Sequence, residues 1–66
     1  IKMYSKEALS DIFERVLQFE IDAESIYNEC IEKLEDETAI DILQTIRNEE
    51  RGHIELARRL IEIIQD

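Results

Sequence analysis

Apolar residues recur at alternating steps of three and four along two long stretches of the chain, which is the spacing of amphipathic helices. The first stripe reads Leu9, Phe13, Val16, Glu20, Ala23, Tyr27, Ile31 and Leu34, and the second reads Ala39, Leu43, Ile46, Glu50, His53, Ala57, Leu60 and Ile64. The pattern predicts helices over about 5–34 and 37–64, with Ser5 and Asp36 as their N-caps. The chain is then a single domain over 1–66, folded as an antiparallel hairpin with a tight turn.

The apolar faces of both predicted helices are wider than one hairpin can cover. They include further apolar side chains beside each stripe: Ile12, Phe19, Ile26, Ile40, Ile42, Ile54, Leu56, Ile61 and Ile63. A chain of 66 residues buries only a modest share of its surface alone, and small scaffolds need a disulfide, a metal or a partner chain. We therefore expect an all-α fold in which the hairpin dimerises into a four-helix bundle.

Composition narrows the classes of partner. The net charge of −9 argues against nucleic acid and anionic membranes, because both attract basic surfaces. The chain contains no apolar run of the roughly eighteen residues that a membrane span needs, so a cytoplasmic setting is expected. Cys30 is the only cysteine, which excludes an intramolecular disulfide, and we expect it to be a small buried hydrophobe. The arginines have carboxylates at helical spacing and are expected to form surface pairs.

Three polar residues interrupt the apolar stripes, namely Glu20, Glu50 and His53. Glu50 and His53 are three residues apart and share a helix face. With Asp36 at the apex of the turn, a rise of about 1.5 Å per residue places all three residues roughly 21–26 Å from the turn. They should therefore meet at one level of the bundle. Burying carboxylates without partners is costly, so this meeting calls for an explanation.

A two-fold axis at that level would assemble four glutamates and two histidines, the ligand set of a carboxylate-bridged di-iron site. Two Fe²⁺ ions would balance the four carboxylates in charge, so the expected cofactor is two iron ions per dimer. By this hypothesis Glu50 bridges the ions, while His53 and Glu20 are terminal ligands. The structural alternative is that Glu50 and His53 form a satisfied core pair beside Glu20.

With these residues in place, the sequence resembles the encapsulated ferritins, which are half-length ferritin-like proteins. The resemblance covers about residues 13–64 and rests on the thirty-residue gap from Glu20 to Glu50, on Tyr27, and on the Asn48-Glu49-Glu50 run before His53. It implies a ferritin-like bundle and a ferroxidase that oxidises Fe(II) with dioxygen for iron storage and detoxification. It also implies a decameric ring of dimers inside an encapsulin nanocompartment, and a place for Tyr27 beside the centre.

The sequence departs from that family at positions around the site. Ile26 stands where the family often has an aromatic residue, and Phe19 replaces one carboxylate of an outer metal site, of which Asp22 could be another member. The Tyr27 hydroxyl could hydrogen-bond a ligand carboxylate, or the ring could simply belong to the core. Two other functions remain open: a rubrerythrin-like di-iron peroxidase, and a metal-free helical dimerisation module.

Overall fold

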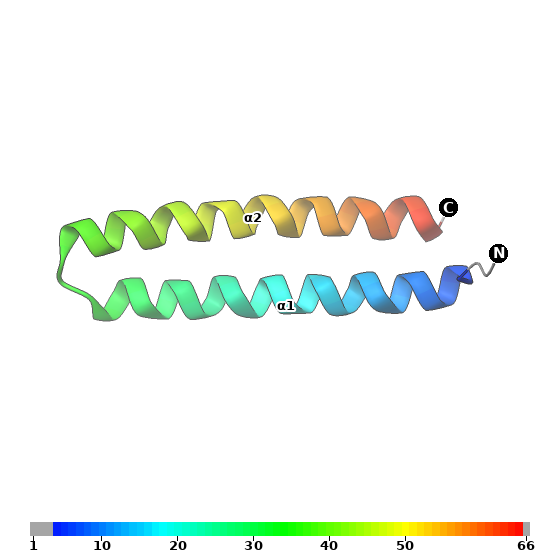
Figure 1. Ribbon diagram of the computed structural model, residues 1–66, viewed down its shortest axis with the longest axis horizontal. Helices are drawn as coiled ribbons and strands as arrows, with labels where there is room; N and C mark the ends of the chain where they lie inside the picture. The colour runs from blue at the N-terminus through cyan, green and yellow to red at the C-terminus, as the bar shows by residue number, and fades with distance from the viewer. Residues whose placement is uncertain (1–3, 66) are drawn as a thin grey trace.

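The protein is a pair of antiparallel helices joined by a short turn. The computed structural model describes residues 4–65, in which α1 spans Lys6–Lys33 and α2 spans Glu37–Gln65. The two helices lie side by side along their whole length, and the start of α1 lies beside the end of α2, opposite the turn (Figure 1). The molecule measures 51 × 20 × 14 Å, so it is only one helix thick in its shortest dimension. This confirms the predicted all-α hairpin.

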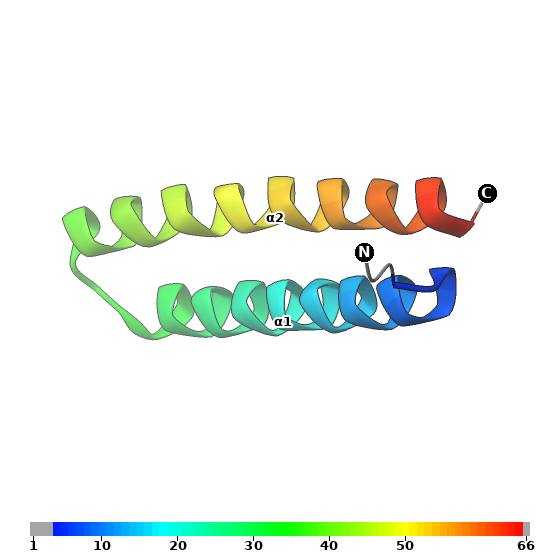
Figure 2. The ribbon, with the colours of Figure 1, turned by 45° about the vertical axis from the view of Figure 1, so that its right-hand side comes forward.

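Both helices begin at the residues that the sequence predicts. The Ser5 side chain accepts a hydrogen bond of 3.1 Å from the backbone N–H of Ala8, and the Asp36 carboxylate accepts one of 2.9 Å from that of Ala39. Each cap satisfies a backbone donor that the first turn of a helix leaves free. The connecting residues 34–36 are not helical and run obliquely from the end of α1 to the start of α2 (Figure 2).

The hairpin has almost no core of its own. Among the described residues only Ile54 and Ala57 are buried, with exposed fractions of 7% and 5%. Large apolar side chains remain open to solvent: Tyr4, Val16, Phe19, Ile26, Leu34, Ile42, Leu56, Leu60 and Ile63. Apolar surface on this scale is unusual for a monomeric protein and indicates a partner. The structure contains one chain, so assembly into a four-helix bundle stays a prediction.

The seam between the helices differs in one respect from the predicted stripe on α2. Ile54 and Ile61 lie on the edge of α2 nearest α1, whereas Leu60 is exposed and His53 is half exposed, although its Nδ1 lies 3.5 Å from Glu20 of α1. Because the predicted stripe belongs to a four-helix bundle, its assignment at His53 and Leu60 stays a prediction. The stripe on α2 has two apolar edges, and the sequence period alone does not indicate which edge faces the neighbouring helix.

On the other side of the seam, Val16 of α1 is 45% exposed, and Leu34, which follows the helix as its C-cap, is 40% exposed. The half-buried Leu17 lies toward α2 in place of Val16. Cys30 is also exposed, so the expectation of a buried thiol is wrong for the hairpin. Cys30 falls on the same helical edge as Val16 and Ile26, which is turned away from α2.

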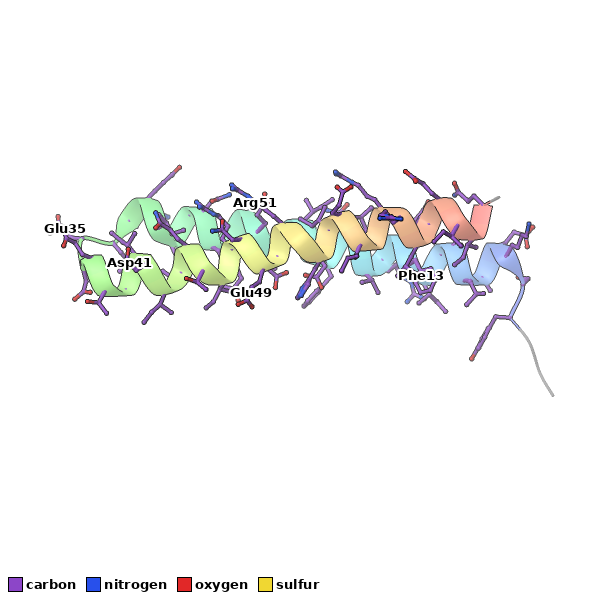
Figure 3. All side chains as sticks on the ribbon, turned by 90° about the horizontal axis from the view of Figure 1, so that it is seen from above. Phe13, Glu35, Asp41, Glu49 and Arg51 are labelled. Carbon is purple, nitrogen blue, oxygen red and sulfur yellow. The ribbon has the colours of Figure 1, made fainter. Side chains whose placement is uncertain are left out.

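The two long sides of the hairpin differ in character. On the side that we call the polar flank, Arg51 contacts Glu24 and Arg47 contacts Asn28. The exposed apolar side chains of both helices lie on the opposite side, the apolar flank, defined as Val16, Phe19, Ile26, Ile42, Leu56, Leu60 and Ile63. Arg51 and Glu49 point to opposite edges of α2 (Figure 3). Neither of the described helices has the length and apolarity that a membrane crossing requires.

Candidate metal centre

Glu20, Glu50 and His53 meet at one point between the helices. One ligand atom from each residue can be chosen so that all three atoms lie within 4.8 Å of one another. Nδ1 of His53 is 3.5 Å from Oε2 of Glu20 and 3.8 Å from Oε1 of Glu50. The predicted agreement in height is therefore confirmed: α1 supplies one carboxylate, and α2 supplies the other together with the imidazole.

The cluster lies at the middle of both helices. In α1, fourteen residues precede Glu20 and thirteen follow it; in α2, thirteen precede Glu50 and twelve follow His53. The distance along the chain from the turn is thus nearly the same on either side. An antiparallel pair of helices with such a short connection brings these positions together as a matter of geometry.

The two carboxylates are largely removed from water, whereas the imidazole is not. The side chains of Glu20 and Glu50 are each 17% exposed, and that of His53 is 55% exposed. One oxygen of each carboxylate, Oε2, is buried and has no hydrogen-bond partner. Buried polar atoms are normally satisfied, so two carboxylate oxygens without a hydrogen-bond partner at one place are available to bind a cation.

The electrostatics of the cluster also favour a cation. The pKa of Glu50 is raised above its ordinary value of 4.5, first because a protonated Glu50 can hydrogen-bond the facing Glu20 carboxyl, and also because of desolvation and repulsion from Glu20. His53 acts in the opposite direction, and Glu49 adds a smaller repulsion. Without a cation, Glu50 therefore binds a proton more readily than an isolated glutamate does.

The donor set suits a divalent transition metal. Carboxylate oxygens and an imidazole nitrogen together fit Fe²⁺ or a similar ion, whereas Ca²⁺ and Mg²⁺ prefer oxygen ligands alone. Three side chains leave the coordination of one ion incomplete. His53 lies on the same edge of α2 as Leu56 and Leu60, so the open side of the cluster faces the apolar flank.

Two other predicted residues lie outside this cluster. Tyr27 is half-buried, and within residues 4–65 its hydroxyl makes no hydrogen bond to a ligand carboxylate. Asp22 is exposed and accepts a hydrogen bond of 2.9 Å from the Gln18 amide. Asp22 therefore lies on the outer surface of α1, and the structure does not bring it to the three ligands. Whether either residue assists the centre stays a prediction.

Sequence reasoning missed two polar contacts between the helices near the site. Nε of Arg51 lies 3.2 Å from Oε2 of Glu24, and Nη1 of Arg47 lies 3.3 Å from Oδ1 of Asn28. The expectation that these arginines pair with carboxylates on their own helix is wrong for both. The sequence held one signal for these contacts. The two arginines are four positions apart on α2, and their two partners are four positions apart on α1.

Comparison with protein-family models, with curated proteins and with solved structures gives no match for this chain. The resemblance to encapsulated ferritins therefore rests only on the residues of this sequence that were named for it.

Proposed function

We propose that this chain is half of a ferritin-like four-helix bundle that binds two iron ions per dimer and oxidises Fe(II) with dioxygen. The observation that carries the proposal is the convergence of Glu20, Glu50 and His53 from two helices, with buried, unsatisfied carboxylate oxygens that face each other. Structural carboxylates in a small protein are normally paired or solvated. These two carboxylates are only 17% exposed, and within the described residues their one potentially cationic neighbour is His53, with no Lys or Arg paired to either of them.

The proposed partner is a second copy of the chain, packed on the apolar flank. The exposed apolar residues lie on both sides of the ligands along the hairpin, with Ile26 and Ile42 toward the turn and Leu56 and Leu60 toward the chain ends. A two-fold axis perpendicular to the helices at the level of the ligands would pair each half of this flank with the other half. Because the ligands lie at the middle of both helices, the two hairpins would overlap along their full length.

Such a pairing would also complete the site. It would bring a second set of two carboxylates and one imidazole to the open side of the cluster, making a neutral site for two Fe²⁺. The surrounding apolar side chains, such as Phe19 and Leu56, would exclude water and strengthen the hold of the carboxylates on the cations. Like-charged copies, each with a net charge of −9, associate only weakly unless such apolar contacts and cations offset the repulsion.

In the proposed reaction iron is the substrate. Two Fe(II) ions each give up one electron, and one dioxygen molecule takes up the two electrons and two protons to form hydrogen peroxide. The carboxylates of Glu20 and Glu50 would favour the product, because hard anionic oxygen ligands stabilise Fe(III) more than Fe(II). His53 would supply the single nitrogen ligand in each half. The ring of dimers and the encapsulin shell remain expectations from the resemblance.

The test is the rate at which Fe(III) absorbance appears in the near ultraviolet after two Fe(II) per dimer are added to metal-free protein in air. We expect the wild-type protein to oxidise iron much faster than buffer does. Glu50→Gln, which keeps the shape of the side chain but removes its charge, should lose the acceleration. Glu55→Gln is the matched control, because it removes one exposed carboxylate from the same helix without touching the cluster.

Rates equal to those in buffer with both dioxygen and hydrogen peroxide would exclude the ferroxidase and favour the metal-free dimerisation module. A rate that is low with dioxygen but high with hydrogen peroxide would favour the rubrerythrin-like peroxidase instead. Loss of activity in Glu55→Gln as strong as that in Glu50→Gln would show that iron oxidation depends on general surface acidity.

A further inference from the structure

The polar contacts between the helices are concentrated beside the candidate metal centre. Arg51 contacts Glu24, and Arg47 contacts Asn28 one turn closer to the turn of the hairpin. Within residues 4–65, the other ion pair between the helices joins two of the ligands, His53 and Glu20. Apolar packing tolerates small shifts of one helix along another, whereas an ion pair with defined atoms restricts them.

These two contacts belong to one antiparallel register. Arg47 and Arg51 are four residues apart on α2, and Asn28 and Glu24 are four residues apart on α1 in the reverse direction. Residues four apart lie on the same helix face, so both contacts form together or shift together. The Arg47 side chain is held further by Oδ1 of Asn48 at 3.4 Å.

The Glu24–Arg51 pair is linked closely to the ligands through the helix backbones. Glu24 comes one turn after Glu20 on α1, and Arg51 lies between Glu50 and His53 on α2. The pair lies on the polar flank, while the metal ligands open toward the apolar flank. The pair and the ligands therefore hold the two helices from opposite sides at nearly one level, at a distance of about 18 Å or more from the covalent turn.

We propose that the Glu24–Arg51 ion pair is a positioning device that sets the separation and register of α1 and α2 at the metal centre, and that it thereby tunes metal affinity and coordination geometry. This inference rests on the proposed metal site. Arg51 also neutralises Glu24, so the additional carboxylate near Glu20 does not compete as a ligand. Neither residue contacts the ligand atoms, so the effect on the metal is transmitted by the helix backbones.

The test uses Co²⁺, whose visible absorption reports both binding and coordination geometry, added to the metal-free full chain. Because Arg51 is 53% exposed and Glu24 27%, the pair is partly screened, and we expect Glu24→Gln to weaken Co²⁺ binding by about two- to fivefold. Glu24→Arg places two cations together and should weaken binding by about tenfold or more. The double variant Glu24→Arg, Arg51→Glu should restore affinity to within about twofold of wild type.

The control is Glu29→Gln, which removes the same charge from an ion pair within α1, where Glu29 contacts Lys33. It should leave Co²⁺ affinity unchanged. The absorption spectrum at saturating Co²⁺ gives a second readout, because a general loss of stability lowers affinity but does not alter the geometry of the bound ion. We expect a shifted spectrum for Glu24→Arg and the wild-type spectrum for the double variant.

Two results would overturn the inference. In one, Glu24→Gln and Glu24→Arg bind Co²⁺ as Glu29→Gln does, with the wild-type spectrum. In the other, the double variant fails to recover although it remains as helical as wild type. Failure of the wild-type protein itself to bind Co²⁺ is a different outcome, because it would contradict the proposed function on which the inference depends.

Discussion

Nδ1 of His53 on α2 lies 3.5 Å from Oε2 of Glu20, a residue thirty-three positions earlier on α1. The buried oxygen of Glu20 has no other partner, while the imidazole is more than half exposed at the edge of the apolar flank. One side chain thus comes from the interior and the other from the surface that a partner would cover. If a metal binds here and a second copy covers this flank, as proposed above, metal binding and association would depend on each other.

The metal-free protein should be less stable near neutral pH than at mildly acidic pH. The folded-state pKa of Glu50 is raised, so its favourable contribution is complete below the unfolded value of 4.5 and is lost as the pH rises through the folded value. Urea unfolding of wild type and of Glu50→Gln at a series of pH values measures this contribution. The difference between the two curves matters, because the general acidity of the chain acts on both. If the unfolding free energies of the two proteins change with pH in parallel, the raised pKa of Glu50 would be contradicted.

Added metal should reverse that dependence. A cation bound by Glu20 and Glu50 requires deprotonated carboxylates, so binding releases the proton that Glu50 holds at lower pH, and it weakens as the pH falls. Isothermal titration with Co²⁺ in buffers of different ionisation enthalpy counts the released protons. We expect fewer released protons from Glu50→Gln and an unchanged number from Glu55→Gln. Proton release that is the same for all three proteins would place the binding elsewhere on the acidic surface.

Disrupting the apolar flank should prevent self-association without unfolding the hairpin. Ile42 is 56% exposed in the single chain, so Ile42→Lys loses little within the hairpin. In a symmetric dimer it removes two apolar contacts worth roughly 1–3 kcal/mol each, which raises the dissociation constant at least tenfold. Sedimentation equilibrium measures the change. Gln65→Lys adds the same charge on the polar flank and should associate as wild type does.

Removing the cap of α2 should lower stability by about 1 kcal/mol. The Asp36 carboxylate accepts the backbone N–H of Ala39, and Asp36→Ala leaves that donor without a protein partner. Thermal unfolding of Asp36→Ala and of the isosteric Asp36→Asn distinguishes the hydrogen bond from the charge, since asparagine also caps helices well. Equal losses in both variants would assign the effect to the charge near the helix end.

Gly52→Ala should stabilise the protein by about 0.5–1 kcal/mol, because glycine in the middle of a helix costs conformational entropy. A methyl group at this position meets no atom within 4 Å in the hairpin. Chemical unfolding at a fixed protein concentration measures the gain. A loss of stability, combined with weaker self-association, would show that a partner packs closely against this position in the assembled protein.

The height of the site could be predicted from the sequence because it depends on few quantities. The rise per residue of a helix is fixed, and Asp36 marks the turn, so the positions of Glu20, Glu50 and His53 follow from counting. The caps at Ser5 and Asp36 could be predicted equally well, because serine and aspartate are preferred at the N-cap position of a helix.

The inner edge of α2 could not be predicted in the same way. Ile54 and Leu60 are both apolar at helical spacing, and only the packing of α1 determines that Ile54 is buried and Leu60 exposed. The contact between Arg51 and Glu24 was missed for a related reason. A long flexible side chain has carboxylates within reach on its own helix, and the sequence does not indicate which one it selects.

The scarcity of buried residues has a consequence for how much active protein a cell would contain. A hairpin in which only Ile54 and Ala57 are buried, among the described residues, gains little free energy from folding alone. With a second copy as the partner, folding and pairing become one equilibrium, and at low abundance the yield of complete sites rises with the square of the chain concentration. Halving the chain concentration would then remove about three quarters of the complete sites, so the number of sites would fall faster than the amount of protein.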